Sequence, residues 1–285
     1  MGIKLEAKPV VAYLRENIRH RINKLDAAGV IPTILIIRIG NGKDDISYEK
    51  GILKNCDLLG INSQVLALPI DVSMELLIKI LEDANKDEKI SGILLFRPLP
   101  LHLDSEVLSK VIDPAKDIDC MSPVNLEKVF EGKSRYFVPC TARAVVELLK
   151  YYKVPLSGAN VVVVGNSLVV GKPLTMLLMD ENATTTVCHI KTKDTSAFTA
   201  KADIVVVAIG KARFMTEGYF SQNSIVVDVG INDAGDGKLC GDVDFDHVLD
   251  KVKAITPTIG GIGTITTTIL LSHVVMACEA NIKAS

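Results

Sequence analysis

The sequence lacks any long run of charge of one sign, and its formal net charge is only -2 over 285 residues. We therefore expect neither nucleic acid nor an anionic membrane as a partner. It also lacks long apolar runs, since stretches such as 161–164 and 204–209 are far too short to span a bilayer. The start of the chain is charged and amphipathic, without the apolar core of a signal peptide, which predicts a cytoplasmic protein.

Metal-binding patterns are also missing. The six cysteines form no Cys-x-x-Cys pair, and the five histidines show no metal-ligand spacing. We therefore predict no metal site. Most of the cysteines lie in apolar or strand-like surroundings, which predicts buried free thiols.

The sequence does contain a regular alternation of apolar, strand-like runs with amphipathic segments of helical length. The strand-like runs are TILIIRIG, SQVLALP and GILLF in the first half, and NVVVVG, ATTTVCHI, ADIVVVAIG, SIVVDVGIN and AITPT in the second. This alternation is typical of parallel sheets with crossover helices, and the length suits two domains. We predict an α/β fold of two parallel-sheet domains with flanking helices, with a Rossmann-like domain in the C-terminal half. The segment CMSPVN after Asp119 is predicted to be a loop.

Ligands of open parallel sheets bind beyond the carboxyl ends of the strands, so the loops that follow the strands are the candidate sites. In the second half these loops come after Gly165, His189, Gly210, Gly230 and Pro257. Gly165-Asn166-Ser167 follows a strand and precedes a helix start, where backbone N–H groups can face a phosphate. The run lacks the G-x-G-x-x-G pattern, and a glycine at such a junction often serves geometry alone. The polar or glycine residues at the other strand ends favour a cofactor site.

Two other features remain open on the residues alone. The run Gly260-Gly261-Ile262-Gly263 has two equally good interpretations. It could form a turn that leads into the last helix, or it could let the backbone contact a flat ligand ring. Tyr48 lies at the start of a predicted helix just past the strand end at Gly40, and Asp117 and Asp119 lie in a proline-flanked loop after the third strand and its following helix. A lone Tyr or Asp in a loop is usually solvated or a cap.

Taken together, the ordered segments resemble the methylenetetrahydrofolate dehydrogenase/cyclohydrolase (FolD) family over essentially the whole chain. The segments that carry the resemblance are Tyr48, FRPLPLHLD, KDIDC, Pro139 to Thr141, VVVVGNSLVVGKP, ATTTVCHIKT, ADIVVVAIG, VVDVGIN, GDVDF and ITPTIGGIGTIT. The resemblance implies oxidation of 5,10-methylenetetrahydrofolate with NAD or NADP, in one-carbon metabolism and purine biosynthesis. It also implies a folate-binding catalytic domain of residues 1–139 plus 265–285, an NAD(P)-binding domain of residues 140–264, and a folate cleft between them.

The same resemblance implies roles for individual residues. Asp119 would accept the paired N–H donors of the pterin ring, and Tyr48 would stack on or orient the folate. Gly260 and Gly261 would lie near the nicotinamide and the folate. The dinucleotide would be lined by Gly165, Asn166, Ser167 and Ile231. The family also implies a homodimer formed through the cofactor domain.

The sequence departs from the family pattern at the cyclohydrolase residues. The family has a lysine four residues after the tyrosine, where this chain has Ile52, and a glutamine that bonds this lysine, where this chain has Phe96. Loss of a hydride from methylenetetrahydrofolate leaves a cation that its two flanking nitrogens stabilise. Correct positioning of substrate and cofactor can therefore suffice for the dehydrogenase step. Hydrolysis of the methenyl product needs a placed base. We therefore predict a dehydrogenase whose cyclohydrolase activity is weak or absent; the alternative is a fully bifunctional enzyme.

A second departure concerns the cofactor. The NADP-preferring pattern of the family has an arginine where Asn166 stands and a serine where Ile190 stands. Without the guanidinium, a 2′-phosphate loses its best partner, which favours NAD. Lys191 and Lys193 lie near enough to bind NADP instead.

Two other functions remain as alternatives to a methylenetetrahydrofolate dehydrogenase. One is a dehydrogenase for another small substrate, and the other is a non-catalytic folate- or nucleotide-binding relative.

Overall fold

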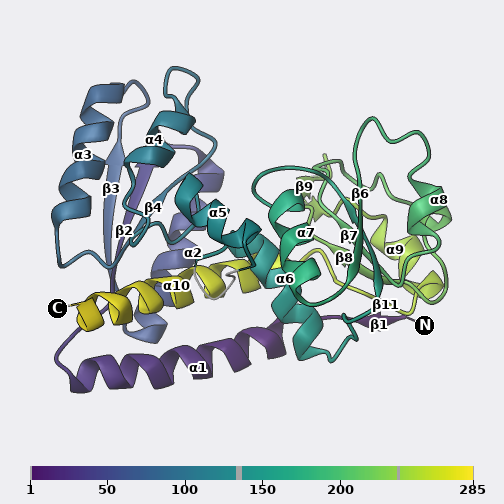
Figure 1. Cartoon of the computed structure of the whole chain (residues 1–285). Helices are drawn as coiled ribbons and strands as arrows, with labels where there is room; N and C mark the ends of the chain where they lie inside the picture. The colour runs from purple at the N-terminus through teal and green to yellow at the C-terminus, as the bar shows by residue number, and fades with distance from the viewer. Residues whose placement is uncertain (1, 133–136, 236–237, 285) are drawn as a thin grey trace. The chain divides into compact units, whose positions relative to one another are not determined.

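The computed structural model describes residues 2–132, 137–235 and 238–284, and the chain divides into two compact units (Figure 1). The three-stranded unit comprises the described residues of 13–128, 135–138 and 267–285. The six-stranded unit comprises the described residues of 1–12, 129–134 and 139–266. Both contain parallel sheets flanked by helices, so the predicted fold class is confirmed.

The three-stranded unit has a parallel sheet in the order β3-β2-β4. The strands are β2 (Thr33–Ile39), β3 (Asn62–Leu68) and β4 (Gly92–Leu95). Every residue of the central strand β2 is buried, which explains the aliphatic run at 34–37. The helices that lie in this unit, wholly or in part, are α1 (Ala7–Ala27), α2 (Lys43–Leu59), α3 (Met74–Lys86), α4 (Ser105–Val111), α5 (Pro123–Phe130) and α10 (Ile262–Ala284).

Local sequence explains where α3 begins and which face it buries. The Ser73 hydroxyl accepts a hydrogen bond from the backbone N–H of Leu76 at 3.2 Å, which satisfies one of the free donors of the first turn. Leu77, Leu81 and Ala84 recur at helical spacing and are buried, so α3 presents an apolar stripe. Leu77 and Leu81 join the hydrophobic core that contains Leu35 of β2.

The six-stranded unit has a parallel sheet in the order β1-β11-β8-β7-β5-β6. Its strands are β1 (Ile3–Lys4), β5 (Asn160–Val164), β6 (Thr184–Cys188), β7 (Ile204–Val207), β8 (Ile225–Asp228) and β11 (Ala254–Ile255). The chain passes from β5 to β6 on one side and then to β7 on the other, which makes β5 a topological switch point. The remaining elements are α6 (Cys140–Tyr151), α7 (Gly171–Asp180), α8 (Ser196–Thr199), α9 (Phe245–Val248), the hairpin β9 (Asn232–Asp233) and β10 (Leu239–Cys240), and two 3-10 turns at Glu217–Tyr219 and Leu249–Lys251.

Two details differ from the sequence prediction. Residues 1–12, predicted to belong with the first domain, lie in the six-stranded unit because Ile3 pairs with Ala254 and extends that sheet. The predicted loop CMSPVN is helical from Pro123 onward, because α5 begins there. The Asp117 carboxylate accepts hydrogen bonds from the Ser122 N–H and the Asn125 amide, and proline suits the first helical position.

Among the described residues, α10 is long and apolar enough to cross a membrane by length and composition. However, 61% of its apolar window is buried inside the protein. Its apolar composition is therefore accounted for by packing in the core. All six cysteines are buried free thiols, as predicted for most of them.

Candidate functional site

A cavity of about 720 Å³ opens at the carboxyl ends of three strands in the six-stranded unit. Its walls come from the loops after β5, β6 and β7, which flank the topological switch point, the usual ligand position in open α/β sheets. The volume lies within the range of small-molecule and cofactor sites. The lining residues on the first loop are Gly165, Asn166 and Ser167, all three predicted as cofactor residues.

The turn between β5 and α7 admits only glycine at two positions. Gly165 has a φ of +128°, and a Cβ there would lie 2.2 Å from the Ala208 carbonyl oxygen. A Cβ on Gly171 would lie 2.0 Å from the Gly165 carbonyl oxygen. The Ser167 hydroxyl accepts a hydrogen bond from the Val170 N–H at 3.2 Å, which fixes the turn just before α7 begins. The turn therefore places backbone of residues 165–167 on the cavity wall next to the N-terminus of α7. Backbone N–H groups in such a position suit a phosphate-bearing cofactor.

A buried carboxylate shapes another wall of the cavity. Asp242 is 0% exposed, and its Oδ2 accepts hydrogen bonds from the backbone N–H groups of Ile209 at 2.7 Å and Gly210 at 3.0 Å. Its Oδ1 accepts from the Lys211 N–H at 2.8 Å. Ile209 and Lys211 line the cavity, so Asp242 holds the loop after β7 in the shape that bounds it.

Asp228, at the end of β8, is a second buried carboxylate beside Asp242. Burial, the largest cause, raises the pKa of Asp228 from its ordinary value near 3.8 to about 6, although its oxygens accept hydrogen bonds from the backbone N–H groups of Gly230, Asp242 and Val243. The charge of Asp242 also raises this pKa.

We expect Asp228 to make folding stability depend on pH. Between about pH 4 and pH 6 the folded state binds more protons than the unfolded state, because its pKa is the higher one. The stability that this group contributes is therefore present at acid pH and is lost as pH rises through that window, by about 3 kcal/mol. Urea unfolding of wild type and Asp228→Asn across this range should show the wild type gaining relative stability at acid pH. A difference that stays constant with pH would contradict this assignment.

The predicted substrate residues of the three-stranded unit form a chain of contacts. The rings of Tyr48 on α2 and Phe96 after β4 lie 5.3 Å apart between centroids. The next residue, Arg97, forms an ion pair with Asp119, with Nη2 and Oδ2 separated by 2.5 Å. Ile52, one turn after Tyr48, is 0% exposed, and Phe96 is 7% exposed. Ile52 and Phe96, the two positions at which the sequence analysis expects a departure from the family pattern, are thus both buried apolar side chains.

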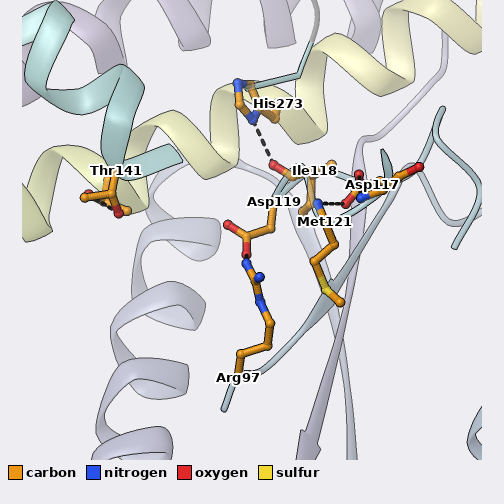
Figure 2. A network of polar contacts seen from close by, with 9 residues as sticks. Arg97, Asp117, Ile118, Asp119, Met121, Thr141 and His273 are labelled. Carbon is orange, nitrogen blue, oxygen red and sulfur yellow. Dashed lines mark hydrogen bonds and ion pairs between the residues drawn. The ribbon is translucent and has the colours of Figure 1, made fainter. Parts of the chain in front are cut away.

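Figure 2 shows how the loop that carries Asp119 is held. Asp117 is 1% exposed, and its Oδ1 accepts a hydrogen bond from the Met121 N–H at 2.8 Å. Burial raises the pKa of Asp117, the largest effect on this carboxyl. His273 of α10 contacts the Ile118 carbonyl oxygen through Nδ1 at 2.8 Å. Asp117 therefore stabilises the loop through its hydrogen bonds. The side chain of Asp119 on the same loop is 26% exposed and thus accessible from solvent.

The glycine turn before α10 gathers another group of predicted residues in the six-stranded unit. Gly260 has a φ of +76°, and a Cβ on Gly261 would lie 2.1 Å from the Pro257 carbonyl oxygen. Ile231 reaches this turn, because its Cδ1 would be 3.3 Å from a Cβ on Gly263. Ile231 is 56% exposed and is not among the residues that line the 720 Å³ cavity. The structure thus places Ile231 beside the glycine turn and not on the wall of that cavity.

The sequence analysis named three cavity residues beyond the first loop: His189 and Ile190, which follow a strand, and Lys193 as a cation able to bind NADP. Other cavity residues were not singled out from the sequence. Phe214 and Tyr219 lie in an irregular stretch without a motif, and nothing in the sequence marked them. Arg97 was also missed, because its ion pair becomes visible only in the folded chain. The lining residues beyond the first loop include His189, Ile190, Thr192, Lys193, Lys211, Phe214 and Tyr219.

Comparison with known proteins gives full-length matches. The family described as tetrahydrofolate dehydrogenase/cyclohydrolase matches with its catalytic domain at residues 5–119 and its NAD(P)-binding domain at residues 139–282. The "Bifunctional protein FolD 1" of Desulfitobacterium hafniense is 52% identical over 276 residues, covering 97% of this chain and 98% of that protein.

Solved structures agree with this match. The bifunctional FolD enzyme of Campylobacter jejuni is 34% identical, with a TM-score of 0.95 over 98% of this chain and 99% of that one. The Trypanosoma brucei dehydrogenase-cyclohydrolase, solved with NADP and an inhibitor, is 30% identical, with a TM-score of 0.93 over 99% of each chain. With both domains matched and such relatives spanning nearly its whole length, the chain belongs to the tetrahydrofolate dehydrogenase/cyclohydrolase family.

Proposed function

We propose that this enzyme oxidises 5,10-methylenetetrahydrofolate to 5,10-methenyltetrahydrofolate, with a nicotinamide cofactor as the hydride acceptor. The observation that carries the proposal is the pairing of two features in one chain of this family. One is the Gly165 turn, which opens on a cavity of cofactor size. The other is Asp119, which is retained and displayed on a rigidly held loop.

The bound nicotinamide supplies the hydride-accepting carbon, and the chain binds and orients the two reactants. Gly165, Asn166 and Ser167 would bind the pyrophosphate side of the cofactor through backbone N–H groups. Asp119 would accept the N–H donors of the pterin ring, and Tyr48 would lie against the folate. Gly260, Gly261 and Ile231 would contact the nicotinamide end. Positioning of this kind can lower the barrier strongly without a base.

We further propose that the cyclohydrolase step is weak or absent. Addition of water to the methenyl carbon needs proton transfer from a placed base. Ile52 and Phe96 are apolar and buried, so neither position offers a proton acceptor. A second candidate, the fully bifunctional enzyme, is favoured by the names of the relatives, which describe both activities. The restoring double substitution treated in the Discussion separates these two candidates.

NAD is the proposed cofactor. Support comes from Asn166 and Ile190, which both line the cavity and carry no positive charge toward a 2′-phosphate. Lys193 also lines the cavity and is the cation best able to bind NADP, whereas Lys191 is not among the lining residues.

We expect Asn166→Arg to shift the cofactor preference toward NADP by about tenfold in kcat/KM, because a guanidinium forms charge-assisted hydrogen bonds to a phosphate. Steady-state kinetics with NAD and NADP measure the ratio. Asn223→Arg, at an exposed position outside the cavity, is the matched control and should leave the ratio unchanged. A wild-type KM that is lower for NADP than for NAD would contradict the proposal.

We also propose a cytoplasmic location and a homodimer formed through the six-stranded unit. The homodimer is supported by the position of β6 at the end of the sheet, where within the described residues it pairs only with β5. Val187 of β6 is 37% exposed. An edge strand of this kind offers backbone groups that a second copy can cover.

A further inference from the structure

The ion pair between Arg97 and Asp119 lies at the proposed substrate site, and the proposed reaction gives Arg97 no role of its own. Arg97 follows β4, and the isolated parallel bridge between Ile93 and Asp117 brings the Asp119 loop alongside that strand. The two side chains point toward one another (Figure 2). They are 29% and 26% exposed, so both keep a face toward solvent.

Arg97 differs from Arg21 and Arg38 of the same unit in how fully its guanidinium is bound. Arg21 donates two hydrogen bonds to Glu279 and a third to Ser272. Arg38 donates to Glu49, Asn41 and the Gly40 carbonyl. Over the described part of the chain, the guanidinium of Arg97 has a single partner, Asp119. Since a guanidinium carries five N–H donors, Arg97 retains donors for a ligand.

The pair therefore presents a carboxylate acceptor beside a cationic donor. Together the two side chains complement a ring that has N–H donors next to a carbonyl oxygen. The 2-amino-4-oxo pyrimidine edge of a folate has that order: the amino group and ring N–H would face Asp119, and the C4 carbonyl would face Arg97. A 4-amino analogue would turn N–H donors toward the guanidinium and leave it without an acceptor, which is costly in a site built for hydrogen bonds.

We propose that Arg97 is a specificity-determining residue that reads the 4-oxo group of the pterin ring beside Asp119. The inference rests on the proposed folate substrate and goes beyond it by naming the group on the ring that Arg97 recognises. The competing explanation is that Arg97 merely occupies Asp119 and has to leave before substrate binds. The two predict opposite effects when Arg97 is removed.

The test compares the binding of folic acid and of its 4-amino analogue aminopterin by calorimetry with the full-length protein, at neutral pH, where both rings are uncharged. Wild type should prefer folic acid. Arg97→Leu should lower this preference about tenfold, through weaker binding of folic acid. Arg97→Lys, which keeps a cation but loses the planar fork, should retain part of the preference. Arg21→Leu breaks an ion pair of similar exposure on α1 and α10 and should leave the preference unchanged.

Three results would overturn the inference. An unchanged preference in folded Arg97→Leu, with normal folic acid binding, would overturn it while leaving the folate function intact. Tighter binding of both compounds by Arg97→Leu would establish that Arg97 competes with the ring for Asp119. Wild-type protein that binds neither compound and does not oxidise methylenetetrahydrofolate would overturn the proposed function and the inference together.

Discussion

Ile52→Lys combined with Phe96→Gln should create enzyme-catalysed hydrolysis of methenyltetrahydrofolate, about 100-fold faster than with the wild type. A placed general acid or base typically contributes this much or more. The substitutions put an amine one helical turn after Tyr48 and an amide at the end of β4. The measurement is the loss of methenyl absorbance with isolated methenyltetrahydrofolate and no reduced cofactor, corrected for spontaneous hydrolysis.

Both substitutions are needed because the site is buried. Ile52 is 0% exposed, so a lysine alone there would place an ammonium in apolar surroundings, which destabilises the fold or leaves the amine neutral. Phe96→Gln provides a hydrogen-bonding partner, at the cost of the ring contact with Tyr48. Ile52→Lys alone should therefore show a lower unfolding temperature and little hydrolysis.

The matched control for this experiment is Leu58→Lys with Phe130→Gln. These positions are 50% and 76% exposed, so the same two chemical changes are made on α2 and α5 without burial. The control should fold normally and hydrolyse nothing beyond the spontaneous rate. A folded Ile52→Lys, Phe96→Gln protein without any gain, or a wild type that already hydrolyses at the level of that variant, would contradict the account of these positions.

Asp119→Asn should reduce kcat/KM for methylenetetrahydrofolate by roughly 100- to 1000-fold. The amide turns an N–H donor toward the N–H donors of the pterin and also breaks the ion pair with Arg97. A site that loses its hydrogen-bond match in this way discriminates strongly against its substrate. Binding of NAD should be unchanged, because the Gly165 cavity is formed entirely by the six-stranded unit.

Asp104→Asn provides the comparison for Asp119→Asn. The Asp104 carboxylate accepts hydrogen bonds from the Glu106 and Val107 N–H groups at the start of α4, where asparagine caps about as well as aspartate. Its kinetics should match those of the wild type. If Asp119→Asn also kept wild-type kcat/KM, Asp119 would not be the pterin acceptor.

The buried strands β2, β4, β5, β7 and β8 were predictable from the sequence because each contains an aliphatic run bounded by glycine or polar residues. Runs such as 161–164 and 204–207 form β5 and β7 and are fully buried. The two-residue strand β1 carries no such signal. Its place in the sheet depends on the pairing of Ile3 with Ala254, which are distant in sequence.

The candidate site likewise contains residues that carry a local sequence signal and residues that do not. Gly165 and Asp119 were identifiable because special backbone geometry and a family pattern mark them. Arg97 was not, since the bridge between Ile93 and Asp117 is what brings its loop to Asp119. The onset of α5 was hidden for a similar reason: Asp117, which helps to fix it, precedes Pro123 by several residues and acts through Ser122 and Asn125.

The central claim, a dehydrogenase without an effective cyclohydrolase, is tested most directly by one time course of the wild-type protein with methylenetetrahydrofolate, run once with NAD and once with NADP. Absorbance reports the reduced cofactor and the methenyl product together. We expect both to rise in equal amounts, faster with NAD, and the methenyl product then to decay only at its spontaneous rate. Loss of the methenyl product that speeds up with enzyme concentration, or no reduction of either cofactor, would contradict the claim.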